Sequence, residues 1–172
     1  ADTSVADAHP HRVSGAGKAM NGNEVFYSIM GLEEPPWAQR AADFALSVLD
    51  LLEKRNWQVS LTLCDDTTIQ ALNRDYRHID APTDVLSFPL GEFMPVEEGE
   101  DIYIAGDVVI SVPTLHRNAA EFGVAVDEEL RRLIIHGILH LSGMDHSDNS
   151  PDQPMLELQE RLLRQMGGDA IL

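Results

Sequence analysis

Three histidines lie close together in the segment HGILHLSGMDH, which runs from His136 to His146. His136 and His140 are four residues apart, so on a helix their side chains lie on the same face, at the separation that two ligands of one tetrahedral ion require. Gly143 favours the left-handed conformation that ends a helix, and this turn would bring His146 back toward the other two. The spacing therefore predicts a metal site made by His136, His140 and His146.

The ligand set indicates which metal chemistry to expect. Three imidazoles without a fourth protein ligand are typical of a catalytic zinc site, because a structural site normally closes its fourth position with Cys or His. The open position would hold water, and one set of ligands predicts one Zn²⁺ per chain. The competing interpretation, that these are ordinary core or surface histidines, fits a lone histidine better than three at this spacing.

The same histidine and glycine spacing occurs in metzincin metallopeptidases. Those enzymes carry Glu directly after the first histidine as their general base, whereas this chain has Gly137, which has no side chain to move a proton. A metallopeptidase is therefore disfavoured, although it would use the same three ligands.

The composition limits the partners that the chain can bind. Its 172 residues, 44% of them hydrophobic, suit a single domain with a substantial core. Twelve basic and twenty-nine acidic residues give a net charge of −17, which argues against broad electrostatic binding to nucleic acid. Cys64 is the only cysteine, so no intramolecular disulfide can form.

The first residues differ from the rest of the chain. Residues 1–19 are small and polar without an apolar period, so we expect a disordered tail or a cloning remnant, with incidental histidines at His9 and His11, and one domain over residues 20–172. No apolar run is long enough to span a membrane, and the N-terminus lacks the apolar core of a signal peptide. We therefore expect no membrane association and a cytoplasmic location.

Hydrophobic periodicity and capping residues predict four strands and five helices. The strands are expected over 24–30, 57–64, 83–88 (ended by Pro89) and 102–111 (with a bulge at Gly106). The first two helices are expected from Pro35 and Pro36 to about Arg55, and after Asp65 to His78. The other three are expected from Ser111 to Phe122, from a cap at Asp127 through His140, and from Pro154 to Met166. Strands grouped ahead of helices predict an α+β fold with one sheet covered by helices. The helix that carries His136 and His140 is apolar enough to be central in this fold.

Three segments together resemble the YbeY family of bacterial metal-dependent endoribonucleases. They are LNRDYRHIDAPTDVLSFP (72–89), AGDVVIS (105–111) and HGILHLSGMDH (136–146), and the similarity extends from Glu24 to Gly168. The resemblance implies a small mixed β-sheet with helices packed around it. It also implies a single-strand-specific RNA hydrolase that acts in 16S ribosomal RNA 3′-end maturation and ribosome quality control. Its partners would be ribosomal RNA and a ribosomal particle or a ribosome-associated protein.

The resemblance also implies roles for particular residues. His136, His140 and His146 would hold zinc, and Arg77 matches the arginine that the family places in its active cleft, so Arg77 and His136 are the candidate catalytic residues. A three-histidine zinc can activate water or polarise a phosphoryl oxygen, and an arginine can bind phosphate through two hydrogen bonds. For Arg77 considered alone, a solvated position at a helix end is the competing interpretation.

Four further residues are candidates for the surroundings of the metal. Asp145 could orient a ligand imidazole, act as a base, or cap the turn after Gly143. The resemblance places Thr83, Asp84 and Ser87 on a strand beside the site, although alternation along a strand would leave some of them on a solvated face. A non-enzymatic ribosome assembly factor with structural zinc is the main rival function, and the sequence leaves open whether water or the RNA 2′-hydroxyl is the nucleophile.

Overall fold

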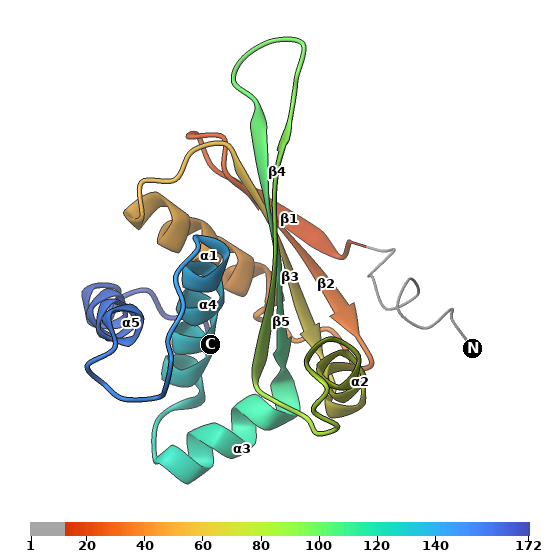
Figure 1. Cartoon of the computed structure of the whole chain (residues 1–172), viewed down its shortest axis with the longest axis vertical. Coiled ribbons are helices and arrows are strands. Elements are labelled where there is room, and N and C mark those ends of the chain that lie inside the picture. Colours follow the sequence, from red (N-terminus) through yellow and green to blue (C-terminus); the bar gives the residue numbers. More distant parts are fainter. Residues whose placement is uncertain (1–12) are drawn as a thin grey trace.

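A computed structural model describes residues 13–172 and shows a five-stranded sheet with helices on both of its faces (Figure 1). The strands are β1 (Gly15–Lys18), β2 (Glu24–Met30), β3 (Trp57–Cys64), β4 (Val85–Met94) and β5 (Ile102–Ser111). The helices are α1 (Ala38–Leu51), α2 (Asp66–Arg77), α3 (Val112–Phe122), α4 (Val126–Leu141) and α5 (Pro154–Gln165).

The strand order in the sheet is β1-β2-β3-β5-β4. The β2–β3 and β3–β5 pairs are parallel, whereas β1 and β4 pair antiparallel with β2 and β5 at the two edges. The predicted α+β fold with a small mixed sheet is therefore confirmed.

The two faces of the sheet bury different cores. Alternation along β5 directs Val108 and Ile110 into the main core under α1 and α4, and Val109 into a smaller core under α2. Figure 1 shows α1 and α4 on one side of the sheet, α2 on the other, and α5 packed outside α4. As predicted, α4 is central, since it also contacts β4, β5 and α3.

The first strand corrects the prediction of a disordered tail through residue 19. Residues Gly15–Lys18 pair with β2 as an edge strand. A Cβ at Gly15 would stand 2.5 Å from the ring of Tyr27, so the glycine allows the two strands to approach. Residues 1–12, including His9 and His11, lie outside the described part of the chain.

Two predicted boundaries are also wrong. The helix expected to reach Arg55 ends at Leu51, and Glu53 and Asn56 adopt positive φ angles of 59° and 55° as the chain turns into β3. The strand expected to end at Pro89 continues to Met94. A proline can remain there because β4 is an edge strand, and the register shifts beside Pro89, opposite the predicted bulge at Gly106 (φ 138°).

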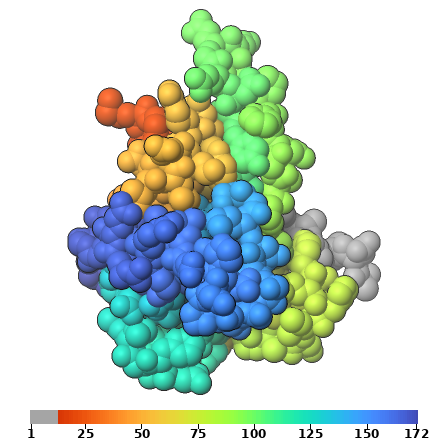
Figure 2. All heavy atoms as spheres, turned by 60° about the vertical axis from the view of Figure 1, so that its left-hand side comes forward, coloured from red at the N-terminus to blue at the C-terminus, as the bar shows by residue number. Residues whose placement is uncertain are grey.

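The extension of β4 and the start of β5 form a hairpin that projects from the body of the protein, seen at the top of Figures 1 and 2. The acidic loop at its tip covers residues 95–101, between the end of β4 at Met94 and the start of β5 at Ile102. In the part of the chain from residue 13 onward, no helix has the length and apolarity needed to cross a membrane.

The start of α4 differs in detail from the prediction. Asp127 lies inside the first turn, and Ala125 occupies the N-cap position. The Asp127 carboxylate instead accepts hydrogen bonds from the backbone N–H groups of Ile171 and Leu172 and forms an ion pair with Arg131, all at 2.7–2.8 Å. This residue therefore ties the C-terminal end of the chain to α4.

Candidate metal centre

The three predicted metal-ligand histidines lie together at the C-terminal end of α4. His136 and His140 occupy its last turns, and Gly143 (φ 97°) reverses the chain so that His146 returns beside them. The ring centroids are 4.7 Å (His136–His140), 5.2 Å (His136–His146) and 5.6 Å (His140–His146) apart. One ring nitrogen of each lies within 4.8 Å of the other two, so these three side chains could hold a metal ion.

Hydrogen bonds determine which nitrogen of each histidine is free. Nδ1 of His136 lies 2.6 Å from Oε1 of Gln159, Nδ1 of His140 lies 3.1 Å from the carbonyl oxygen of Met144, and Nδ1 of His146 lies 2.9 Å from that of Asp148. Because each of these oxygens can only accept, every Nδ1 carries the proton. Each Nε2 is then left with a lone pair.

The free nitrogens meet at a distance that suits a metal. Nε2 of His140 lies 3.1 Å from Nε2 of His136, where two lone pairs would repel each other without a cation between them. Two nitrogen ligands of a tetrahedral zinc are about 3.3 Å apart. Burial lowers the pKa of His136 and of His140, which favours the neutral form that binds metals. The donor set therefore fits a zinc ion.

Gln159 holds His136 in place and was missed by the sequence reasoning. It lies on α5, is 7% exposed, and also donates from Nε2 to Glu160 at 3.1 Å. This second bond turns the amide so that Oε1 faces the histidine. Gln159 interrupts the buried stripe of Met155, Leu162 and Met166, and a polar residue at a core position of a helix is the signal that could have found it.

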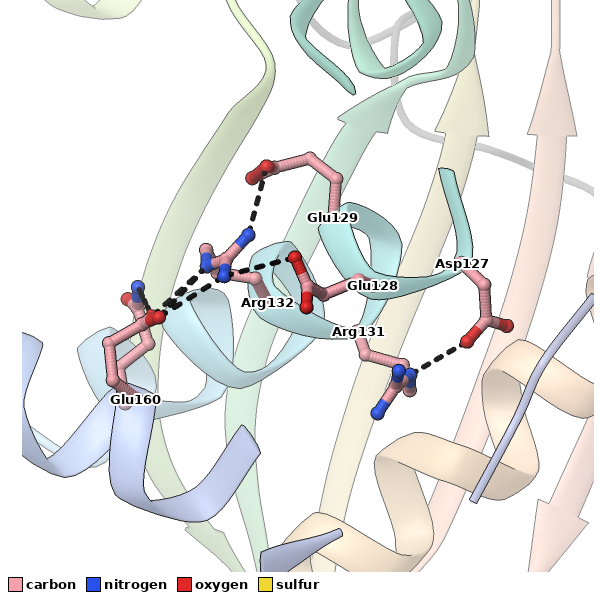
Figure 3. Close-up of polar contacts among 7 residues, drawn as sticks. Asp127, Glu128, Glu129, Arg131, Arg132 and Glu160 are labelled. Atoms are coloured by element: carbon pink, nitrogen blue, oxygen red, sulfur yellow. Dashed lines mark hydrogen bonds and ion pairs between the residues drawn. The ribbon is translucent and has the colours of Figure 1, made fainter. Parts of the chain in front are cut away.

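The carboxylate of Glu160 is fixed in turn by Arg132. Nε and Nη2 of Arg132 lie 3.0 and 3.1 Å from the two oxygens of Glu160, and Figure 3 shows the same guanidinium reaching Glu128 and Glu129. Burial alone would raise the pKa of Glu160, but the hydrogen bonds from Arg132 and Gln159 hold it below its usual value. Hydrogen bonds thus connect Arg132 to Glu160, Glu160 to Gln159, and Gln159 to His136.

A hollow of about 430 Å³ opens beside one of the three histidines, His140. His140 and the turn from Leu141 to Asp145 form one wall, and Trp57, Pro89 and Tyr103 form the other.

Comparison with known sequences identifies the family of this chain. The family described as Endoribonuclease YbeY matches residues 30–167. The chain belongs to the YbeY family. It is 55% identical to the Endoribonuclease YbeY of Treponema denticola over 77% of this chain and 88% of the relative, and 49% identical to that of Treponema pallidum over 83% and 89%.

One solved structure resembles this fold. The solution structure of a Thermotoga maritima protein matches 83% of this chain and 90% of its own, with 30% identity and a TM-score of 0.57. It shares the fold of this YbeY-family chain.

Packing explains why this YbeY-family chain carries glycine where a metallopeptidase has its base. A Cβ at Gly137 would stand 2.5 Å from Cγ1 of the buried Val108 on β5. Ser87 on β4 donates to the Gly137 carbonyl oxygen at 3.4 Å. Position 137 therefore faces the sheet and serves the packing of α4.

The other candidate residues around the metal site make different contacts. The Asp145 carboxylate accepts from the backbone N–H of His146 at 2.8 Å and is 3.9 Å from Nδ1 of His140, which favours the turn-capping role. Asp84 accepts from the backbone N–H of Val85 at 2.8 Å and from Asn118 at 3.2 Å, and its charge acts to raise the pKa of His136. Thr83 donates to Asp84 at 3.5 Å. Asp84 thus contributes to the electrostatics of the site.

Arg77 is the last residue of α2, which packs on the face of the sheet opposite α4. Its side chain is exposed and forms no hydrogen bond or ion pair with any residue from 13 to 172. It is therefore free to bind a ligand, and its catalytic role stays a prediction.

Proposed function

We propose that this protein is a single-strand-specific, zinc-dependent endoribonuclease that acts in 3′-end maturation of 16S ribosomal RNA and in ribosome quality control. The observation that carries the proposal is the convergence of three histidines, with their Nε2 lone pairs free, in a chain 55% identical to a protein named as an endoribonuclease. The substrate would be presented in the cytoplasm by a ribosomal particle or a ribosome-associated protein.

The residues of the site would have different roles in this reaction. His136, His140 and His146 would hold the metal, which when bound supplies Lewis acidity and an acidic water for phosphodiester hydrolysis. Gln159 keeps His136 in the orientation that binding needs. Arg77 would bind two oxygens of the phosphate and stabilise the charge that develops during cleavage.

The metal content tests the ligand assignment. We expect about one zinc per chain and loss of that zinc in His140→Ala, because two imidazoles no longer define a tetrahedral site. The measurement is metal analysis after dialysis, with His9 and His11 replaced by Ala in both proteins so that they cannot contribute. Stoichiometric zinc in His140→Ala would mean that the ligands are misassigned.

Arg77 tests the nuclease against the rival assembly factor. We expect Arg77→Lys to cut single-stranded RNA at least about tenfold more slowly with unchanged thermal stability, because lysine keeps the charge but lacks the planar pair of donors. Arg74→Lys on the same helix is the control, since Arg74 is exposed and paired with Asp75. Full ribosome maturation in cells that carry a cleavage-inactive Arg77→Ala would instead favour a non-enzymatic assembly factor.

A further inference from the structure

Three aromatic side chains form a row across adjacent strands. Trp57 on β3 is the register partner of Tyr103 on β5, and Tyr103 is the partner of Phe93 on β4. The ring centroids are 4.9 Å apart for Trp57–Tyr103 and 5.0 Å for Phe93–Tyr103. Register partners project from the same face of a sheet, so the three rings make one continuous aromatic row.

The row leads away from the metal site. Trp57 and Tyr103 form one wall of the hollow of about 430 Å³ whose other wall contains His140. A second hollow of about 610 Å³ contains Trp57, Tyr103 and Phe93 together with Arg55. The rings thus lie between an inner hollow at His140 and an outer hollow on the hairpin.

The three rings of the aromatic row are not fully buried in the core. Trp57 and Tyr103 are only partly buried against the main core, and Phe93 is 70% exposed on the projecting hairpin. An exposed aromatic row on a sheet is the surface on which single-stranded RNA-binding domains stack unpaired bases, and the stacking contact itself involves the uncharged base and not the phosphate. This mode of binding suits a protein with a net charge of −17.

The charged residues beside the aromatic row favour one path for the phosphate groups of a bound RNA strand. Nζ of Lys54, one of only two lysines in the chain, lies 4.7 Å from the centre of the Trp57 ring, and Arg55 borders the outer hollow. Glu100 and Asp101 border that hollow as well, and Asn56 donates to Glu100 at 2.7 Å. The sugar–phosphate chain would therefore follow Lys54 and Arg55, away from the acidic tip of the hairpin.

We propose that Trp57, Tyr103 and Phe93 form a stacking platform for unpaired nucleobases of the RNA, next to the bond that is cut at the histidine site. The platform rests on the proposed nuclease function and adds to it a reason for selecting single strands: paired bases are already stacked and cannot lie on the rings.

Tryptophan fluorescence gives a direct test of base stacking. The holoenzyme is mixed rapidly with a short single-stranded RNA, so that binding is recorded before cleavage, and with an abasic strand of the same length. We expect the RNA to quench the fluorescence and the abasic strand to leave it unchanged, because only a base can stack on Trp57. Trp37 is 8% exposed and remains a constant background, and Trp57→Phe should abolish the quenching.

Substitutions then measure the contribution of each ring. Trp57→Leu and Tyr103→Leu should weaken RNA binding on the order of tenfold to a hundredfold, whereas Tyr103→Phe, which keeps its ring, should bind as the wild type does. Phe93→Leu is the variant that spares the core, because Phe93 is largely exposed. Phe122→Leu is the matched control, since Phe122 is also exposed (59%) but lies at the end of α3.

The outcomes separate the platform from the nuclease. Fluorescence quenching by RNA without any cleavage would support the stacking platform and contradict the proposed nuclease function. Cleavage with equal affinity for RNA and the abasic strand, and with no effect of the leucine substitutions at Tyr103 and Phe93, would overturn the platform and leave the nuclease intact. A wild-type dimer that Phe93→Leu dissociates would show that the row is a contact between copies of the chain, which also overturns the proposal.

Discussion

The direction in which an imidazole points decides whether it can be a ligand, and here that direction is set by oxygens outside the metal site. Met144 and Asp148 supply backbone carbonyl groups close in sequence to the histidines that they hold. His136 depends instead on a side chain, Gln159, from a different helix. Its orientation is therefore the one that a single substitution can change.

We expect Gln159→Leu to weaken zinc binding by about tenfold to a hundredfold, because the His136 ring loses the acceptor that fixes its proton on Nδ1. The measurement is competition for the metal with a chelator of known affinity. Gln165→Leu is the control, since Gln165 is an exposed glutamine at the end of the same helix. Unchanged zinc affinity in a folded Gln159→Leu protein would show that the ring is held by packing alone.

The sequence could predict the three histidines as metal ligands, but not the residues that hold His136 in its orientation. The ligands occur within one helix and the turn that follows it, so their spacing carries the geometry. Gln159 lies 23 positions after His136 in the sequence and reaches it only because α5 packs against α4. Its neighbours Glu160 and Arg132 look like ordinary surface charges until that packing is known.

At the scale of elements, Asp66 joins two helices that follow different strands. Its carboxylate at the start of α2 accepts from Ser111 (2.7 Å), Thr114 (2.6 Å) and Arg117 (2.7 Å) at the start of α3. Burial alone would raise the pKa of Asp66, but the hydrogen bonds from Thr114, Ser111 and Arg117 outweigh it and hold the pKa below its usual value.

This junction should make stability depend on pH. A carboxyl group with a lowered pKa in the folded state stabilises the protein above its unfolded pKa of about 3.9, and this stabilisation is lost as the pH falls through the folded value. We expect Asp66→Asn to lower the free energy of unfolding by about 1 kcal/mol at pH 7 and by less near pH 3. Denaturant unfolding at both pH values measures this. Asp75→Asn serves as the control, because its ion pair with Arg74 is exposed.

The elements that could be predicted are those with a periodic apolar pattern. β2, β3, β5 and α3 agree with the prediction within a residue or two because alternation or capping residues mark them. β1 has no such pattern, since its four residues GAGK become a strand only by pairing with β2. The extension of β4 past Pro89 is likewise set by its partner β5 and by its place at the sheet edge.

At the scale of the whole molecule, the cations available to RNA are fewer than the sequence suggests. Arg74, Arg117, Arg131 and Arg132 all form ion pairs with carboxylates. Arg77 forms none with the residues that the structure describes, and Lys54 lies over the Trp57 ring. These four arginines are therefore engaged, whereas Arg55, Arg161 and Arg164 form no ion pair with a carboxylate among the residues that the structure describes.

The salt dependence of RNA binding should reflect the excess of acidic over basic residues in the chain. Each phosphate neutralised by a protein cation releases counterions, so six to ten contacts reduce affinity by roughly a thousandfold or more between 50 and 200 mM salt. With a net charge of −17, we expect weak binding to a free single strand and a loss of affinity with salt well below that range. Base stacking would carry most of the remaining affinity, and the stacking contact involves no charge pair that salt can screen.

The measurement is affinity for a single-stranded RNA at several salt concentrations with no partner present. Weak binding with a shallow slope would leave efficient cutting dependent on a ribosomal particle or a basic partner that brings the strand to the histidines. Tight binding with a steep slope would show that a local group of cations outweighs the overall charge, and the need for such a partner would then have no physical basis.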